Sequence, residues 1–94
     1  MDLSIVIPCY NENDAIDMLV GRLDQLLNRF NPDFKTELIF VDDGSVDKTY
    51  QKLLGTYHDR DAIHILRHEQ NQGLGAALQT GLDQASGSFV ATID

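Results

Sequence analysis

The chain has few of the residues that build disulfide frameworks, metal clusters and basic surfaces. Its 94 residues include one cysteine, two prolines and no tryptophan. A single cysteine, Cys9, excludes an intramolecular disulfide and is typical of a reducing compartment, so we expect a cytoplasmic protein. Seven lysine and arginine residues stand against 15 aspartate and glutamate residues, which gives a net charge of −8. Because nonspecific phosphate contacts need a basic face, the composition argues against a nucleic-acid partner.

Long apolar runs are also absent. The run from Leu3 to Pro8 has no basic segment before it and is too short for a signal sequence. No stretch approaches the roughly 20 apolar residues that span a bilayer, so we expect no membrane segment within these residues. The hydrophobic content of 43% is ordinary for a globular protein, and the length suits one domain. The sequence therefore predicts a single domain over residues 1–94.

Short apolar runs alternate with segments of helical periodicity. The pattern predicts strands at 3–7, 37–41, 62–66 and 88–93, and helices at about 13–30, 45–57 and 75–85. We expect Pro8 to end the first strand, Asn13 or Asp14 to cap the first helix, and Gly87 to cap the last one. The βαβαβαβ order predicts an α/β fold of three layers, α/β/α, around a mostly parallel sheet. The exposed edge of the last strand also predicts self-association.

Polar residues gather where the predicted strands end. Ligands of open parallel sheets bind beyond the carboxyl ends of the strands. The first strand is followed by Tyr10, whose flat ring suits a nucleobase, and by Asn11 and Glu12, which offer hydrogen-bonding groups. A plain strand-end turn, with Glu12 favoured by the amino terminus of the next helix, explains these residues equally well. Cys9 has no partner histidine pattern nearby, so we interpret it as packing rather than as a nucleophile.

The second strand ends in Asp42 and Asp43. Neighbouring side chains of an extended chain point to opposite sides, so the two carboxylates are not a cooperating acid–base pair. One of them can face a ligand, because a carboxylate can accept from the imide N–H of a pyrimidine, while the other holds the loop. The competing interpretation is a turn with capping aspartates, since Asp43-Gly44 is a common turn signal.

The third strand leads to a glycine-rich loop and a helix. Gly73 and Gly75 permit close approach of the backbone, and the free N–H groups of the following helix could hold phosphate or sugar hydroxyls. A tight loop with close helix packing explains the glycines at least as well. Arg67 could supply positive charge near a diphosphate, although a lone arginine at a strand end is more often only solvated. His64 alternates within its strand and is interpreted as a half-buried structural residue.

Four segments, taken together in order and spacing, resemble family 2 glycosyltransferases. They are Ser4–Glu12, Val41–Asp47, Asn71–Ala77 with Gly81, and Ala85–Gly87 with Ile93 and Asp94. The resemblance implies the Rossmann-like half of a GT-A fold and an inverting enzyme that uses a nucleotide sugar, such as a UDP- or GDP-sugar. The Gly73–Ala77 segment most resembles the dolichyl- or polyprenyl-phosphate sugar transferase branch. A dinucleotide-binding oxidoreductase is less compatible, because no G-x-G-x-x-G follows the first strand.

The resemblance also implies roles for individual residues. Pro8, Tyr10 and Glu12 would line the nucleotide pocket. Asp43, and after it Asp42, would contact the base.

Asp94 matches the first acidic position of the Asp-x-Asp-type motif, whose carboxylates hold Mg²⁺ or Mn²⁺ in the family. The second carboxylate, the catalytic base and the acceptor-binding half do not occur among residues 1–94, so we expect no catalytic residue here and no activity from these residues alone. We expect the acceptor to be a polyprenyl phosphate or a glycan, and the full-length protein to work at the cytoplasmic face of a membrane. The alternative hypothesis is a stand-alone nucleotide-binding or regulatory module.

Overall fold

A computed structural model describes residues 1–57 and 60–93 of the chain. Four strands alternate with three α-helices, which confirms the predicted βαβαβαβ order. The elements are β1 (Leu3–Cys9), the 3-10 helix η1 (Asn13–Ala15), α1 (Ile16–Leu27), β2 (Thr36–Asp43), α2 (Thr49–Tyr57), β3 (Ile63–His68), α3 (Leu74–Gln84) and β4 (Phe89–Thr92).

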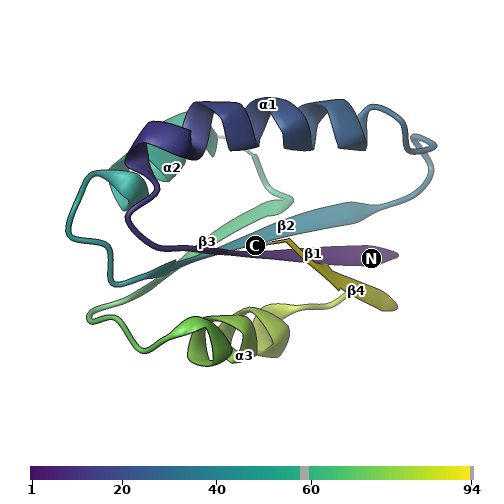
Figure 1. The fold of residues 1–94 in the computed structure, drawn as a ribbon. Coiled ribbons are helices and arrows are strands. Elements are labelled where there is room, and N and C mark those ends of the chain that lie inside the picture. The colour runs from purple at the N-terminus through teal and green to yellow at the C-terminus, as the bar shows by residue number, and fades with distance from the viewer. Residues whose placement is uncertain (58–59, 94) are drawn as a thin grey trace.

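The four strands form one sheet in the order β3-β2-β1-β4, and every neighbouring pair is parallel. Helices α1 and α2 cover one face of this sheet and α3 covers the other (Figure 1). The predicted three-layer α/β/α architecture is therefore confirmed. Because the strands are parallel, all their carboxyl ends meet at the same edge of the sheet, where the loops after β1, β2 and β3 come together.

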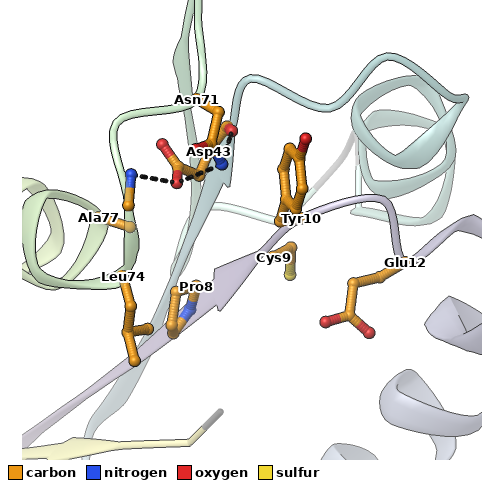
Figure 2. A pocket seen from close by; sticks show the side chains of 9 residues that line it. Pro8, Cys9, Tyr10, Glu12, Asp43, Asn71, Leu74 and Ala77 are labelled. Atoms are coloured by element: carbon orange, nitrogen blue, oxygen red, sulfur yellow. Dashed lines mark hydrogen bonds between the residues drawn. The ribbon is translucent and has the colours of Figure 1, made fainter.

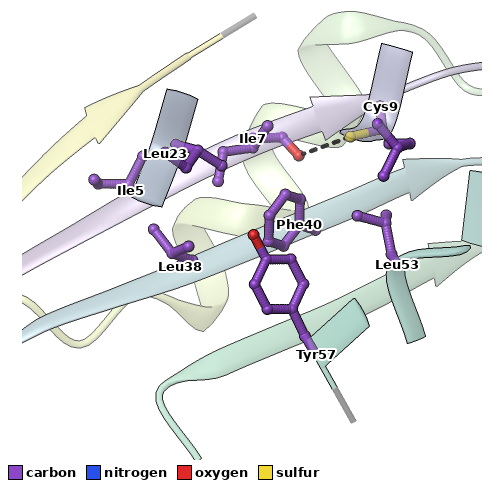
Figure 3. Close-up of a cluster of buried hydrophobic side chains, with 9 residues drawn as sticks. Ile5, Ile7, Cys9, Leu23, Leu38, Phe40, Leu53 and Tyr57 are labelled. Carbon is purple, nitrogen blue, oxygen red and sulfur yellow. Dashed lines mark hydrogen bonds between the residues drawn. The ribbon is translucent and has the colours of Figure 1, made fainter. Parts of the chain in front are cut away.

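The hydrophobic core lies on both faces of the two central strands. Toward α1 and α2, a cluster of buried side chains fills the space between sheet and helices (Figure 3), with the rings of Phe40 and Tyr57 centred 5.2 Å apart. Toward α3, a smaller cluster contains Val6, Ile39, Val41 and Ala77. Burial on both faces explains why these strands are apolar at nearly every position rather than at alternate ones.

Helix α3 approaches the sheet closely at Gly81. A β-carbon at this position would collide with the Cγ1 methyl group of Val6 in β1. The helical spacing predicts Ala76, Ala77, Leu78, Leu82 and Ala85 on or near the packed side of this helix. Ala77, Leu78 and Ala85 do pack toward the sheet, whereas Leu82 is exposed and Gly81 is buried. The missing side chain of Gly81 therefore sets how near α3 lies to β1.

Pro8 does not end the first strand, because β1 continues to Cys9. The Val6 carbonyl oxygen accepts from the Ile93 N–H, so alternate positions of β1 face β4. Among the described residues, β4 pairs with Leu3–Val6 of β1. The backbone nitrogen of Pro8 points toward the same side as Val6 but lies beyond this paired part of the strand. The missing N–H of proline costs no ladder hydrogen bond at such a position.

The predicted helix caps were wrong in two places. The segment 13–30 divides into η1 and α1, and neither Asn13 nor Asp14 caps α1, since Ala15 is its N-cap and makes no side-chain hydrogen bond. Helix α3 ends before Ala85, and Gly87 instead packs against β1, where its N–H donates to Ser4 Oγ at 2.8 Å. Gly87 has no room for a side chain because a β-carbon would clash with the backbone of Leu3 and Ser4.

A buried carboxylate ties together the amino-terminal end of the sheet. Glu37 Oε2 accepts from Ser4 Oγ, from the Ser86 N–H at 2.8 Å and from Ser86 Oγ at 2.9 Å. Glu37 Oε1 lies 3.1 Å from His64 Nε2, and His64 is half-buried, as predicted. Burial raises the pKa of Glu37, but these hydrogen bonds and the nearby His64 outweigh it, so the pKa is lowered overall.

Strand β4 forms an exposed edge of the sheet. All four of its residues are exposed, and Phe89 is 71% accessible. Self-association through this edge stays a prediction. In the part of the chain that the structure describes, no helix has the length and apolar character needed to cross a membrane.

Candidate functional site

The loop after β1 is fastened to the loop after β2. The Asn11 N–H donates to Ser45 Oγ at 2.8 Å, and Asn11 Oδ1 accepts from the Val46 N–H at 3.0 Å. Asn11 has a positive φ of 51°, a conformation that asparagine tolerates better than most residues. The Glu12 N–H donates to Thr49 Oγ1 at 2.8 Å. Asn11 therefore fixes the backbone of this loop, which leaves the side chains of its neighbours free to face outward.

Asp42 and Asp43 contact different partners, as their positions on opposite sides of the strand predict. Asp42 is fully buried, and its Oδ1 accepts a long hydrogen bond from the Ser45 N–H at 3.4 Å. Its Oδ2 lies 3.7 Å from Arg67 Nε and has no hydrogen-bond partner among the residues that the structure describes. The Arg67 guanidinium lies over the Tyr50 ring, 4.6 Å from its centre. Arg67 is thus engaged by Asp42 and Tyr50.

The Asp43 carboxylate is the centre of a buried hydrogen-bond cluster. Its Oδ1 accepts from the Gln72 N–H at 2.9 Å and from His68 Nδ1 at 2.8 Å. Its Oδ2 accepts from the Gly73 N–H at 2.9 Å and from Asn71 Nδ2 at 3.0 Å. These four donors match the roughly four lone-pair sites that a carboxylate offers. Asp43 therefore holds the loop between β3 and α3 against the end of β2.

The same contacts keep Asp43 ionised. Burial raises its pKa, but the hydrogen bonds from Gln72, His68 and Gly73 lower it more, so the pKa of Asp43 lies below its ordinary value. An ionised carboxylate donates no hydrogen bond and offers only acceptor oxygens. The negative charge and the fixed loop amides thus form one rigid polar unit.

Gly44 allows the two loops to meet. It has a φ of 72°, and a β-carbon at this position would collide with the backbone of Gln70 and Asn71. Only glycine combines this left-handed conformation with such a close approach. The Asp-Gly turn seen in the sequence is therefore present, and it brings residues 70–73 next to Asp43.

A cavity of about 250 Å³ opens at this edge of the sheet (Figure 2). Five of the predicted binding residues line it, namely Pro8, Tyr10, Glu12, Asp43 and Gly73, together with Cys9, Asn71, Leu74 and Ala77. Asn11 and Asp42 are not among the lining residues. The structure thus brings together three strand ends that lie far apart in the sequence.

The walls of the cavity differ in character. Tyr10, which is 47% exposed, presents an aromatic ring at one side, while Pro8 and Leu74 provide apolar surface. Asp43 and Asn71 provide the polar wall facing them. A cavity with a flat aromatic residue, apolar surface and a few fixed polar groups suits a planar, partly polar heterocycle.

A second cavity of about 190 Å³ adjoins the first and shares Pro8 and Glu12 with it. Residues of α1, including Met18 and Arg22, line its other side, and Ile93 closes it near the end of β4. Glu12 therefore stands at the junction of the two cavities, where its carboxylate can meet a ligand that extends from one into the other.

Cys9 is buried beside the first cavity. Its Sγ lies 3.7 Å from the Ile7 carbonyl oxygen, and burial, helped by the charges of Glu12 and Asp42, raises the pKa of Cys9 to about 12. A thiol with so high a pKa stays protonated at neutral pH and is a poor nucleophile. The packing role predicted for Cys9 is confirmed.

Asn71 and His68 belong to the site although no role was predicted for either. Asn71 lies in the glycine-rich segment, and its Nδ2 contacts both the Asp43 carboxylate and the Asp43 carbonyl oxygen. Both of these partners are acceptors, which fixes the orientation of the amide. His68 is the last residue of β3, two positions after Leu66, so its place at a strand end was the available signal.

The predicted metal ligand, Asp94, lies outside the described residues. Within residues 1–57 and 60–93, no group of three or more His, Cys, Asp and Glu side chains is placed to hold a metal ion. The described residues of the site offer hydrogen-bonding groups and an aromatic surface to a ligand.

The sequence matches the model of glycosyl transferase family 2 over residues 4–94. The chain belongs to this family. An uncharacterized glycosyltransferase of Synechocystis is 40% identical over 94 residues, covering the whole chain and 29% of that relative. The dodecaprenyl-phosphate galacturonate synthase of Rhizobium johnstonii is 36% identical over 97 residues, covering the whole chain and 28% of that relative. The chain thus spans less than a third of the length of these relatives.

Solved glycosyltransferases share the fold. Staphylococcus aureus TarS in complex with UDP-GlcNAc superimposes with a TM-score of 0.82 and 30% identity, covering the whole chain and 26% of TarS. The mannosyltransferase PcManGT of Pyrobaculum calidifontis, in complex with GDP-Man and Mn²⁺, gives a TM-score of 0.74 and 28% identity, covering 94% of this chain and 25% of PcManGT. The parallel sheet and its helices are the Rossmann-like half of the GT-A fold, as the sequence predicts.

Proposed function

We propose that the first cavity binds the nucleotide portion of a nucleotide-sugar donor, and that the chain is the donor-binding part of a glycosyltransferase. One observation carries this proposal: the Tyr10 ring and the polar wall of Asp43 and Asn71 meet around a cavity of about 250 Å³ at the carboxyl edge of the sheet. The structure of TarS with UDP-GlcNAc supports the assignment, because that protein shares this fold.

In this proposal the base lies against Tyr10, since stacking on an aromatic ring suits any nucleobase. The edge of the base faces Asp43 and Asn71. An Asp43 oxygen would accept a hydrogen bond from the ring N–H of uracil or guanine. The same oxygen would continue to accept from one of the loop donors. Pro8 supplies apolar surface beneath the nucleoside, Glu12 accepts from ribose hydroxyls, and the Gly73 backbone permits close approach of the ligand.

The rest of the donor extends toward the second cavity. The sugar would pass Glu12, which lines both cavities, and the diphosphate would lie toward the residues that follow β4. We assign Asp94 to a divalent cation, Mg²⁺ or Mn²⁺, and the Mn²⁺ held together with GDP-Man in PcManGT supports this assignment. When bound, such an ion would offset the charge of the diphosphate.

We propose further that transfer inverts the anomeric carbon and that the acceptor is a polyprenyl phosphate. The galacturonate synthase of Rhizobium johnstonii supports the acceptor class, because its name specifies dodecaprenyl phosphate. We also propose that the full-length protein works at a membrane, because a polyprenyl chain is held in the bilayer, and we assign it to the cytoplasmic face. Residues 1–94 alone are expected to bind nucleotide weakly and to transfer no sugar, because they correspond to less than a third of the length of the relatives that they match. Sugar transfer by the purified chain would contradict this expectation.

Nucleotide titration of the isotope-labelled chain tests the proposal. UDP and GDP are added separately, each with Mg²⁺, and amide shifts are followed by NMR. The proposal expects amide shifts at residues 9–12, 42–45 and 71–75, and none at the amino edge of the sheet around Glu37 and Ser86. Diamagnetic Mg²⁺ is used for the shift map, and Mn²⁺ is used only for affinity by calorimetry. If neither nucleotide shifts any of these amides, the donor-binding assignment is wrong. Shifts without any transferase activity in the full-length protein would favour a regulatory nucleotide-binding module.

A further inference from the structure

His68 joins three elements of the fold behind the cavity. It is the last residue of β3 and is buried. Its Nδ1 lies 2.8 Å from Asp43 Oδ1 at the end of β2, and its Nε2 lies 2.7 Å from Thr80 Oγ1 on α3. His68 does not line the cavity, and the proposed function assigns it no contact with the ligand. Both ring nitrogens are nevertheless committed to specific partners.

The partners of His68 fix where its proton lies. An ionised carboxylate only accepts, so Nδ1 must carry the hydrogen that points to Asp43. In the neutral ring, Nε2 is then an acceptor and takes the hydroxyl hydrogen of Thr80. Two hydrogen bonds thus connect Asp43, His68 and Thr80 in a row between β2, β3 and α3.

The Asp43 carboxylate is held from two sides. His68 reaches Oδ1 from β3, whereas the donors from residues 71–73 reach both oxygens from the loop. If the His68 hydrogen bond is lost, the loop donors remain, but the carboxylate can rotate or withdraw together with them. The orientation of the Asp43 and Asn71 side chains toward the cavity therefore depends on His68.

We propose that His68 is a positioning residue of the nucleotide site: it orients Asp43, and through Asp43 the loop of residues 71–73, so that their polar groups face the base. This inference rests on the proposed function, because it assigns His68 a role in nucleotide affinity. His68 would act on the nucleotide only through the side chain of Asp43. The hydrogen bond from His68 to Asp43 should therefore matter for nucleotide binding, and the hydrogen bond between His68 and Thr80 should not.

Two substitutions separate the two hydrogen bonds. In His68→Asn, the side-chain amide nitrogen takes the place of Nδ1 and still donates to Asp43, but the contact with Thr80 is lost. In His68→Gln, the longer amide takes the place of Nε2 and reaches Thr80, but it leaves Asp43 without this donor. Thr80→Val is the matched control, because it removes only the partner of Nε2.

Affinity for UDP and GDP is measured by calorimetry for the wild-type chain and for the three variants, after circular dichroism has shown that each is folded. His68→Gln is expected to weaken binding of the nucleotide that the wild type prefers by about tenfold, the effect of one hydrogen bond to a charged group. His68→Asn and Thr80→Val are expected to remain within about threefold of the wild type. Equal affinities of the Gln and Asn variants would overturn the inference.

Two further measurements need no nucleotide. Long-range ¹H–¹⁵N spectra of the wild type should show the proton of neutral His68 on Nδ1, and a proton on Nε2 alone would refute the assignment even if every variant failed to fold. Amide shifts of Gln72 and Gly73 should change in His68→Gln more than in His68→Asn. If the wild type binds neither UDP nor GDP, the proposed function fails, whereas these spectra still decide whether His68 orients Asp43.

Discussion

The buried carboxylate of Glu37 offers a sharp test of how this fold is held together. Replacing Glu37 with alanine removes the acceptor on which the Ser4 hydroxyl and the N–H and hydroxyl of Ser86 converge. The Ser86 N–H cannot reorient toward another partner without moving the connection between α3 and β4. Hydrogen bonds to charged groups contribute about 1.5–3 kcal/mol each and are not additive, so we expect a loss of about 3–5 kcal/mol.

Replacing Glu37 with glutamine separates charge from shape. The amide oxygen can take the place of Oε2, and the amide nitrogen can donate to a neutral His64, so the geometry is kept while the charge is lost. We expect Glu37→Gln to cost about 1–2 kcal/mol at pH 7. The free energy of unfolding of a small domain is about 5–15 kcal/mol. Urea unfolding curves followed by circular dichroism should therefore distinguish both variants clearly from the wild type and from each other. Glu69→Gln, at an exposed position, is the matched control.

The contribution of Glu37 to stability should depend on pH in a direction that follows from its lowered pKa. The pKa of Glu37 is lower in the folded chain than its ordinary value, so the unfolded chain binds a proton more readily. The stabilisation by Glu37 is therefore present above the unfolded pKa of about 4.3 and is lost as the pH falls through the folded pKa. The wild type should approach Glu37→Gln in stability as the pH is lowered from 7 to 3. A constant difference across this range, or a glutamine variant as stable as the wild type at pH 7, would refute the reasoning.

Other substitutions probe packing, reactivity and binding. Gly81→Ala should lower the free energy of unfolding by about 1–3 kcal/mol through overpacking, whereas Gly21→Ala, with open space around it, should raise it by up to about 1 kcal/mol; urea unfolding that gave both changes the same sign would contradict this. Cys9 should resist iodoacetamide at pH 8 until urea unfolds the chain, and modification of the folded chain at the rate of a free thiol would disprove its burial. Tyr10→Ala should weaken binding of UDP or GDP about tenfold in calorimetry while Phe89→Ala leaves it unchanged, and equal effects would remove Tyr10 from the site.

Much of the fold could be predicted because its signals are local. Apolar runs such as Leu38–Val41 and the helical spacing of Ile16 and Leu23 locate elements without knowledge of the rest of the chain. The predicted strand end at Pro8 was wrong for a non-local reason. Whether a proline fits into β1 depends on how far β4 runs alongside this strand. The cap at Gly87 was wrong for the same kind of reason, because this glycine is needed where the chain passes β1 and not where a helix ends.

The candidate site also has features that the sequence could predict and features that it could not. That Tyr10 and Asp43 would lie near one another follows from parallel strands, whose carboxyl ends share one edge. The sequence could not show that Asp43 would be held by four donors, because these come from residues at least 25 positions away whose approach depends on Gly44. Glu37 and His68 were missed because a single polar residue near the start or end of a strand gives no sign of the partners that it will meet.

The strand order β3-β2-β1-β4 has a consequence for how the chain assembles. Strands β1, β2 and β3 can join one after another, each next to its neighbour in sequence, but β4 must cross the sheet to reach the far edge of β1. The hydrogen bond between Ser4 and Gly87 closes a loop of 83 positions, and contacts of such separation form slowly. Helix α3 lies within this crossing segment and brings Leu74 and Ala77 to the cavity. The cavity is therefore lined both by the ends of β1 and β2 and by this crossing segment, so a ligand that binds only the folded chain would stabilise contacts between parts far apart in the sequence.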